Sequence, residues 1–357
     1  MLANFNCIHQ LRLVQKLVYT SSRYMSKEFK GPLFIVGMSR SGTKLLRDIL
    51  NNGSEIGIPS FESHFLPYLV QAFQDVSFPL TGKDATHLKK LVKSSIFYND
   101  IQREEGENFR DLNFKRLAQQ DSIQDSIEYM MSILGNQENI QSTKIWGDKT
   151  PNNLVHMSTL KSAFPEARFI HIIRDPRERA LSAKKAWRAS LVMSAERWNN
   201  GVGEAIKQGS YLETSYTQTT YEGLVANPER EIKRLCDFIG IEYSDSMLQL
   251  SRPAENYDTA SGATAAAQTV IKGNVEKYKR WLTETEIAQI EQLCGGLMES
   301  LGYVLYAESS ENKSISSFKL TLLKIRDMVM TVRFHIQRWG VLGGLHYLWW
   351  RRKVTKI

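Results

Sequence analysis

The sequence predicts an α/β protein in which helices cover both faces of a central parallel sheet. Apolar runs typical of short buried strands occupy residues 33–37 (LFIVG) and 168–173 (RFIHII). The first run is followed by an apolar stripe at helical spacing in residues 45–50. The second is followed by Asp175 and Pro176, which suit the N-cap and first position of a helix. Strands that alternate with helices are typical of parallel sheets buried on both faces.

Further helices are expected on either side of the second strand. The polar stretch 82–140 carries helical patterns and is interpreted as helices that cover the sheet. Residues 227–239 form another predicted helix, which Asn227 caps and Gly240 ends. The serine-rich stretch 307–317 has the composition of a linker.

Length and composition indicate one large domain with added segments. The chain has 357 residues, and 42% of them are hydrophobic, which suffices for a sizeable core and argues against global disorder. We therefore expect a basic amphipathic extension at 1–30, one domain at 31–305, a polar linker at 306–317 and a basic aromatic helical tail at 318–357.

The net charge indicates which classes of partner the protein binds, and the cysteine content indicates its redox compartment. The net charge of +8 favours an anionic partner, namely a nucleotide, a nucleic acid, an acidic glycan or a membrane surface. The three cysteines, Cys7, Cys236 and Cys294, are far apart and suggest neither a metal site nor a disulfide framework. This pattern fits a reducing compartment, and we expect a cytoplasmic protein that is peripherally attached to a membrane.

Both ends of the chain are rich in basic residues. The first 27 residues contain no acid, which resembles an organellar transit peptide or indicates an amphipathic helix ahead of the domain. Residues 318–357 hold nine basic residues, three tryptophans and a single acid, Asp327. Tryptophan together with lysine and arginine on a helix suits an anionic membrane surface. The alternatives are a helix packed on the domain and a surface for an acidic acceptor.

The segment between the first strand and its helix, Gly37-Met38-Ser39-Arg40-Ser41-Gly42-Thr43-Lys44, has the features of a phosphate-binding loop. Backbone N–H groups and the positive end of a helix dipole converge there on an anion. The loop differs from a Walker A motif because Thr43 stands where that motif has lysine and Lys44 follows one residue later. It predicts a three-layer fold like that of the P-loop NTPases.

A second anion site is expected after the second strand. Arg174 ends that strand, and Ser182 lies about two turns into the next helix. Both can face the rim at the carboxyl ends of the strands, where α/β proteins bind ligands. An arginine and a hydroxyl are suitable donors for a phosphate monoester.

The two segments resemble the nucleotide motifs of sulfotransferases that use 3′-phosphoadenosine 5′-phosphosulfate (PAPS). The run R-S-G-T-x-L-L resembles their 5′-phosphosulfate loop, and R-D-P-R followed by Ser182 resembles their 3′-phosphate motif. The similarity spans roughly residues 31–305 and is greatest to the tyrosylprotein and carbohydrate branches. It implies that Arg40, Ser41, Gly42, Thr43 and Lys44 contact the 5′-phosphosulfate and that Arg174 and Ser182 bind the 3′-phosphate.

Two shorter matches add nucleotide-binding candidates. Lys272 and Gly273 resemble the K-G pair of the family's last nucleotide loop, although Ile271 replaces a usual arginine. A charged amphipathic helix is the alternative there. Tyr221 belongs to a Y-E-x-L-x-x-x-P pattern similar to the family's, and it is either a neighbour of the nucleotide or packing at a strand end.

Sulfuryl transfer needs cations beside the leaving oxygen and a base beside the acceptor hydroxyl. Arg40 is one such cation. Lys149 is the candidate for the second, because its W-x-x-K-T-P segment resembles the family segment whose lysine lies beside the sulfuryl group. The alternative is a lysine on a turn before Pro151. Glu62 is the favoured base, because the resemblance is to branches that have arginine in the 5′-phosphosulfate loop, and these use glutamate as the base. His64 is the second candidate for the base. Alternatively, Glu62 is a solvated acid on a loop and has no role in catalysis. No metal is expected, because the protein's cations can stabilise the charge.

The resemblance therefore predicts a sulfotransferase that moves a sulfuryl group from PAPS to a hydroxyl acceptor. A carbohydrate, a glycolipid or another large acceptor is favoured, and peptide tyrosine remains open. One alternative is a P-loop kinase or nucleotide hydrolase, against which Thr43 and the lack of a clear magnesium-binding aspartate argue. Another is a catalytically silent, membrane-associated binding protein. A nucleic-acid partner is not expected, because no recognition motif accompanies the charge.

Overall fold

Five parallel strands form the central sheet in the computed structural model, which describes residues 29–53, 55–106, 109, 111–134, 144–250, 275–306 and 317–354. Their order across the sheet is β2-β3-β1-β4-β5, and β1 therefore lies at the centre. The strands are β1 (Leu33–Val36), β2 (Ile56–Gly57), β3 (Ile145–Lys149), β4 (Arg168–Ile173) and β5 (Tyr216–Thr220). In the register, Ile35 of β1 pairs with Lys149 of β3 and with Ile170 of β4. The two strands predicted from apolar runs are neighbours, and the parallel sheet is confirmed.

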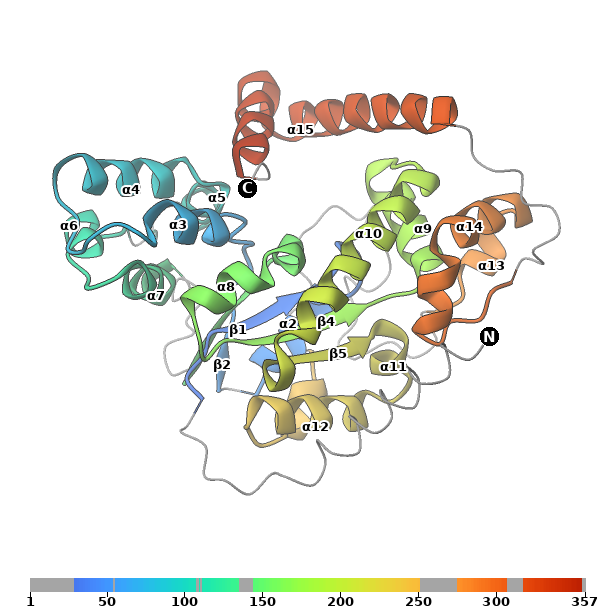
Figure 1. The fold of residues 1–357 in the computed structure, drawn as a ribbon, viewed down its shortest axis with the longest axis horizontal. Helices are drawn as coiled ribbons and strands as arrows, with labels where there is room; N and C mark the ends of the chain where they lie inside the picture. The colour runs from blue at the N-terminus through green and yellow to red at the C-terminus, as the bar shows by residue number, and fades with distance from the viewer. Residues whose placement is uncertain are drawn as a thin grey trace.

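Alternate side chains of β1 enter two different cores, which gives the three layers (Figure 1). Leu33 and Ile35 pack with the helices of one face, whereas Phe34 and Val36 pack with those of the other. The helices beside the sheet are α2 (Thr43–Asn51), α8 (Met157–Ala163), α9 (Pro176–Trp187), α10 (Leu191–Ser210), α11 (Tyr221–Ala226), α12 (Pro228–Ile239), α13 (Tyr278–Trp281) and α14 (Glu284–Ser300). Short 3₁₀ helices are η3 (Pro151–Val155), η4 (Glu213–Ser215) and η5 (Asp245–Leu248). The predicted three-layer arrangement is confirmed.

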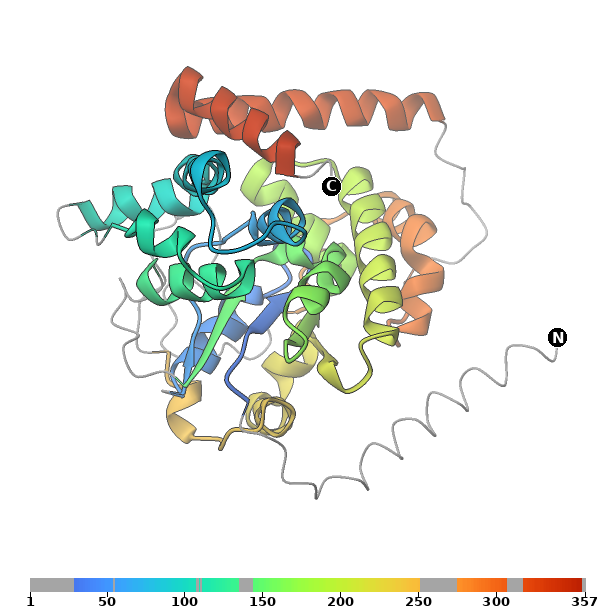
Figure 2. The same ribbon diagram turned by 60° about the vertical axis from the view of Figure 1, so that its left-hand side comes forward.

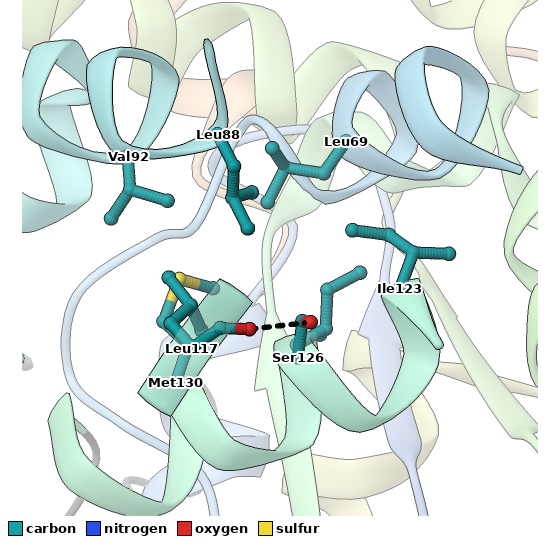
Figure 3. A pocket seen from close by; sticks show the side chains of 8 residues that line it. Leu69, Leu88, Val92, Leu117, Ile123, Ser126 and Met130 are labelled. Atoms are coloured by element: carbon teal, nitrogen blue, oxygen red, sulfur yellow. Dashed lines mark hydrogen bonds between the residues drawn. The ribbon is translucent and has the colours of Figure 1, made fainter. Parts of the chain in front are cut away.

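Between β2 and β3, the described part of the chain forms a block of five helices. It consists of α3 (Leu66–Phe73), α4 (Gly82–Ser94), α5 (Ile96–Glu105), α6 (Phe114–Ala118) and α7 (Ile123–Leu134). Side chains such as Leu69, Leu88 and Met130 converge in its centre and leave no room for a water-sized molecule (Figure 3). Ser126 satisfies its buried hydroxyl there by donating to the carbonyl of Leu117 at 3.0 Å. The block thus has an apolar interior that is continuous with the core on the Phe34 and Val36 face of β1, in the region where covering helices are expected.

The chain continues into the long helix α15 (Ser317–Val354), which contacts α9 and α10. At Gly340 the backbone leaves helical geometry, with φ 71° and ψ 174°, and this kink divides α15 into two arms (Figure 2). The second arm faces α4 across a cleft of about 380 Å³ that His87 and Trp349 help to line. None of the described helices is long and apolar enough to cross a membrane. Residues 1–28 and 307–316, with most of the predicted extension and most of the predicted linker, lie outside the described residues.

Candidate active site

The carboxyl ends of the five described strands lie at one edge of the sheet, and a predicted site residue follows or ends each of them. Across the sheet these are Glu62 after β2, Lys149 at the end of β3, Arg40 after β1, Arg174 after β4 and Tyr221 after β5. Parallel α/β sheets bind ligands at this edge, near the point where the strand order reverses. The topology therefore brings together residues that lie up to 181 positions apart in the chain.

The loop after β1 is held in a conformation that glycines make accessible. At Gly37 a Cβ atom would lie 2.4 Å from the carbonyl oxygen of Ile172, and at Gly42 it would lie 2.6 Å from the ring of Tyr221. Gly42 has φ 98° and caps α2 without a side chain. The first N–H groups of a helix lack intrahelical partners, so the start of α2 presents donors and a positive dipole to the loop.

Arg40 joins the two segments that sequence motifs assign to separate phosphates. Its Nε donates to Ser182 Oγ on α9 at 3.1 Å, and Nη1 of Arg174 donates to the carbonyl of Arg40 at 3.2 Å. Arg40 also adopts φ 76°, a left-handed backbone that non-glycine residues rarely occupy and that concentrates at functional sites. The loop after β1 and the helix after β4 therefore form one connected structure.

Positive charge is concentrated around this loop. Burial, followed by the charge of Arg174, lowers the pKa of Arg40. Burial, followed by the charges of Arg197 and Arg40, lowers the pKa of Arg179 to about 10. Arg179 also supports the loop, because its Nε donates to the carbonyl of Ser39 at 3.1 Å. Arginine side chains carry positive charge, and the cluster thus attracts an anion.

Two buried donors fit an anionic ligand. Within the described residues, Ser41 Oγ and Arg174 Nε are buried without a hydrogen-bond partner. Leaving a buried donor unpaired costs about 1–3 kcal/mol. Phosphate and sulfate oxygens are acceptors that match both groups, so the site fits an anionic group.

Arg174 is itself fixed by residues that sequence analysis missed. Its Nη2 donates to Glu178 at 3.1 Å, and Trp198 donates from its indole to the Arg174 carbonyl at 2.9 Å. The guanidinium lies 4.1 Å from the ring centre of Tyr221, which also packs against Gly42. Tyr221 thus packs at a strand end and borders the loop at the same time. Arg174 precedes α9, which begins at Pro176, so the i, i+4 spacing rule for helices did not indicate its pairing with Glu178.

A second cluster lies on the side of β2 and β3. Lys149 Nζ donates to Glu62 Oε1 at 2.6 Å, and His64 Nε2 lies 3.1 Å from Glu62 Oε2. Burial alone would raise the pKa of Glu62, but the charge of Lys149 and the hydrogen bond to His64 outweigh it. The pKa of Glu62 is therefore held well below its usual range. His64 adopts φ 56°, so this cluster also contains a strained backbone. Of the four predicted catalytic residues, Lys149 and His64 both contact Glu62, and Arg40 belongs to the loop after β1.

Lys149 ends strand β3 and does not lie on a turn, contrary to one sequence interpretation. The preceding residue, Asp148, is buried, and burial raises its pKa. Both of its oxygens accept hydrogen bonds, from Thr150 at 3.1 Å and from Asn153 at 2.9 Å. The strand thus does end near an aspartate, which the sequence analysis overlooked, but that carboxylate serves to hold the chain.

The loop that carries Glu62 is tied to its neighbours at both ends. Thr150 Oγ1 lies 3.2 Å from Ser63 Oγ, and buried Arg47 of α2 donates to the carbonyl of Ser60 at 2.8 Å. These contacts fix Glu62 beside Lys149. The roles of Asp148 and Arg47 were not predicted. Lys272 and Gly273, the remaining predicted nucleotide contacts, lie outside the described residues.

Gly42→Ala should damage both the loop and ligand binding. The added methyl group would meet the Tyr221 ring and require a left-handed φ, which together should cost about 1–3 kcal/mol. Thermal unfolding and calorimetric binding of an adenosine bisphosphate would measure the two effects. Gly296→Ala on α14 is the matched control, because a Cβ there meets open space and alanine favours a helix. If the two variants melted and bound alike, the steric role of Gly42 would be disproved.

Comparison with known proteins identifies the class. Residues 32–245, more than half of the chain, match the model of the sulfotransferase family. The chain belongs to this family.

Individual relatives are more distant. Mouse carbohydrate sulfotransferase 2 is 30% identical over 124 residues, which cover 34% of this chain and 22% of that protein. Protein-tyrosine sulfotransferase 1 of Danio rerio is 24% identical over 168 residues, which cover 44% of this chain and 47% of that protein. The chain thus spans less than half the length of these curated relatives.

Solved structures with a similar course of the chain include two sulfotransferases. The sulfotransferase domain from the Synechococcus PCC 7002 olefin synthase has a TM-score of 0.49 and 19% identity, and the match covers 80% of this chain and all of that one. Mouse SULT7A1 complexed with PAP has a TM-score of 0.42 and 14% identity, with 88% of this chain and 94% of that chain covered.

Proposed function

We propose that this protein transfers a sulfuryl group from PAPS to a hydroxyl group of an acceptor. The observation that carries the proposal is the hydrogen bond between Arg40 and Ser182. It joins the loop that resembles a 5′-phosphosulfate site to the helix that resembles a 3′-phosphate site. A donor nucleotide with anionic groups at both its 5′ and 3′ positions could contact both segments. ATP has no 3′-phosphate and could contact only the first.

The donor side of the site is cationic. The start of α2, Arg40 and the neighbouring arginines would bind the anionic groups of the nucleotide. PAPS would supply the sulfuryl group and leave as 3′-phosphoadenosine 5′-phosphate (PAP). Lys149 and Arg40 would stabilise the charge that develops on the leaving oxygen. A kinase is less well supported, because Asp148 is engaged by Thr150 and Asn153.

The acceptor side of the site contains Glu62. Its carboxylate is ionised and partly exposed, with about a third of the side chain accessible. It would take the proton of the acceptor hydroxyl while the oxygen forms its bond to sulfur. His64 contacts the other carboxylate oxygen and would orient it.

We further propose that the acceptor is a carbohydrate, a glycolipid or another large hydroxyl compound. Two observations support this. The loop carries arginine at position 40, as in the branches that the sequence resembles, and one of the relatives is a carbohydrate sulfotransferase. Another relative is a protein-tyrosine sulfotransferase, so peptide tyrosine belongs in the same acceptor screen.

Calorimetric titration with PAP in the absence of metal tests the donor. We expect PAP to bind more tightly than ATP with magnesium. Arg40→Ala should weaken PAP binding by about tenfold or more, because it removes a hydrogen-bonding positive charge. Arg103→Ala is the control, since exposed Arg103 pairs with Asp100 on α5, outside the candidate site.

Three results would contradict the proposal. A preference for ATP with magnesium would indicate a kinase or a nucleotide hydrolase. Binding of neither nucleotide by a folded protein would indicate a silent binding protein. Binding of PAP with no transfer from PAPS to any acceptor in a broad screen would retain the nucleotide site and contradict the enzyme.

A further inference from the structure

The first arm of α15 has an apolar face that no part of the described chain covers. Phe318, Leu322, Ile325 and Val329 lie on it, and each is between 48% and 75% exposed. Their spacing of four, three and four residues places them along one side of the helix. We call these four residues the outer stripe. Both views show α15 at the margin of the molecule (Figures 1 and 2).

The opposite face of the arm is attached to the protein by a buried acid. Asp327 accepts from the backbone N–H of Ser190 at 3.0 Å, and Arg197 lies 3.7 Å from its other oxygen. At 3.6 residues per turn, Asp327 is about 160° from Ile325 and Val329 around the helix. Lys324 adds an ion pair with Glu196 of α10 at 3.3 Å. The helix therefore has a defined orientation, with its apolar side outward.

The charge of the segment is distributed unequally between the two faces. Asp327 is its sole acid among residues 318–357, and this acid is turned inward. Arg326 and Arg333 are exposed, and helical geometry places both beside the outer stripe. The outward surface thus combines apolar side chains with positive charge. Soluble proteins rarely leave such a patch exposed unless it binds something.

We propose that the outer stripe and its flanking arginines bind the surface of an anionic lipid bilayer. An amphipathic helix of this kind lies in the plane of the interface, with its apolar side chains at the headgroup boundary and its cations on anionic lipids. Beyond the kink, Val341, Leu342 and Leu345 are also exposed apolar residues of α15. The helix attaches the protein through its outer side and remains on α9 and α10 through its inner side.

A bilayer fits this surface better than a second copy of the chain. Pairing two outer stripes would place the apolar residues together but would also bring Arg326 and Arg333 of both copies into the same interface. Such like charges disfavour association. Anionic lipids supply an apolar layer and negative charge together. The inference is independent of the transfer chemistry, because it concerns only α15.

Flotation of the full chain with liposomes tests the proposal. Vesicles of phosphatidylcholine with phosphatidylserine would be compared with phosphatidylcholine alone, and we expect binding to the anionic vesicles. Replacing Leu322, Ile325 and Val329 by serine should reduce binding by tenfold or more, since these side chains are already exposed and contribute little to folding. Replacing Arg326 and Arg333 by glutamine should reduce it about 25-fold at low ionic strength, at roughly fivefold for each arginine.

The matched control replaces the exposed apolar residues Tyr211 and Val304, which lie outside α15, by serine. This variant should bind vesicles as the unchanged protein does. The proposal is overturned if the unchanged protein stays with the unbound fraction, or if the outer-stripe variant floats as well as the control. Sedimentation that showed a dimer lost in the outer-stripe variant, without vesicle binding, would assign the surface to a second copy.

Discussion

Replacing Glu62 with glutamine should lower kcat for sulfuryl transfer by about 10²–10⁴, the usual contribution of a positioned general base. Glutamine keeps the shape of the side chain and can still contact Lys149 and His64, but it cannot take a proton. Donor binding should survive or improve, because Lys149 would no longer be held by a carboxylate at 2.6 Å. The measurements are kcat with PAPS and a reactive acceptor, together with PAP affinity by calorimetry.

His64→Asn separates the two candidate bases. Asparagine tolerates the left-handed backbone at this position, so the loop should keep its conformation. If Glu62 is the base, this variant should lose much less activity than Glu62→Gln. The reverse order would make His64 the base. Equal, small losses in both variants would return Glu62 to the role of an ion-pair partner of Lys149.

The low pKa of Glu62 also predicts the pH dependence. A carboxylate whose folded pKa is depressed stays ionised as pH falls through the ordinary carboxylate range, and it is lost as a base only below its folded pKa. In a plot of kcat/KM against pH, protonation of Glu62 should therefore cause no loss of activity at mildly acidic pH. The stability that its contacts provide should likewise persist there and decline only at lower pH.

The sequence identified the strands that consist of apolar residues and missed those that do not. β1 and β4 are buried runs of hydrophobic residues, so their composition alone predicts them. β3 carries buried Asp148 and Lys149, whose charges resemble a polar turn. β5 is an edge strand of tyrosine, threonine and glutamine, most of it only partly buried, and its polarity hides it.

Site residues could be predicted where the chemistry is local in sequence. The loop around Arg40 and the segment from Arg174 to Ser182 are short motifs, so their residue types and order suffice. The hydrogen bond between Arg40 and Ser182 spans 142 residues, and only the adjacent positions of β1 and β4 create it. Arg47 and Trp198 support the site through backbone carbonyls, which no side-chain pattern in the sequence reveals.

The tail shows the same division between composition and arrangement. The basic and tryptophan-rich composition of residues 318–357 is evident in the sequence. The inward position of Asp327 depends on Ser190 and Arg197, which lie more than 125 residues earlier. That contact, together with the ion pair between Lys324 and Glu196, orients the helix with its apolar face outward.

Lys149→Met should lower kcat by roughly 10²–10³, the loss expected when one group that stabilises transition-state charge is removed. Methionine is unbranched and apolar, so it can fill the buried space that the lysine stem occupies. The substitution also removes the charge that counteracts the burial of Glu62, and the pKa of Glu62 should rise. An NMR titration of the Glu62 carboxyl carbon would measure that rise. Lys144→Met is the control, since Lys144 pairs with Glu55 at the opposite end of β3.

Combining Lys149→Met with Glu62→Gln tests whether the two residues act as a pair. Removing one partner leaves a buried charge without its counter-ion, whereas removing both relieves that cost. We therefore expect the double variant to be more stable than the sum of the two single losses predicts, with the difference measured by urea unfolding. The losses in kcat should also be less than additive, because both residues serve the same transfer step. Additive losses in stability, with no change in the pKa of Glu62 in Lys149→Met, would show that the 2.6 Å contact has no energetic role.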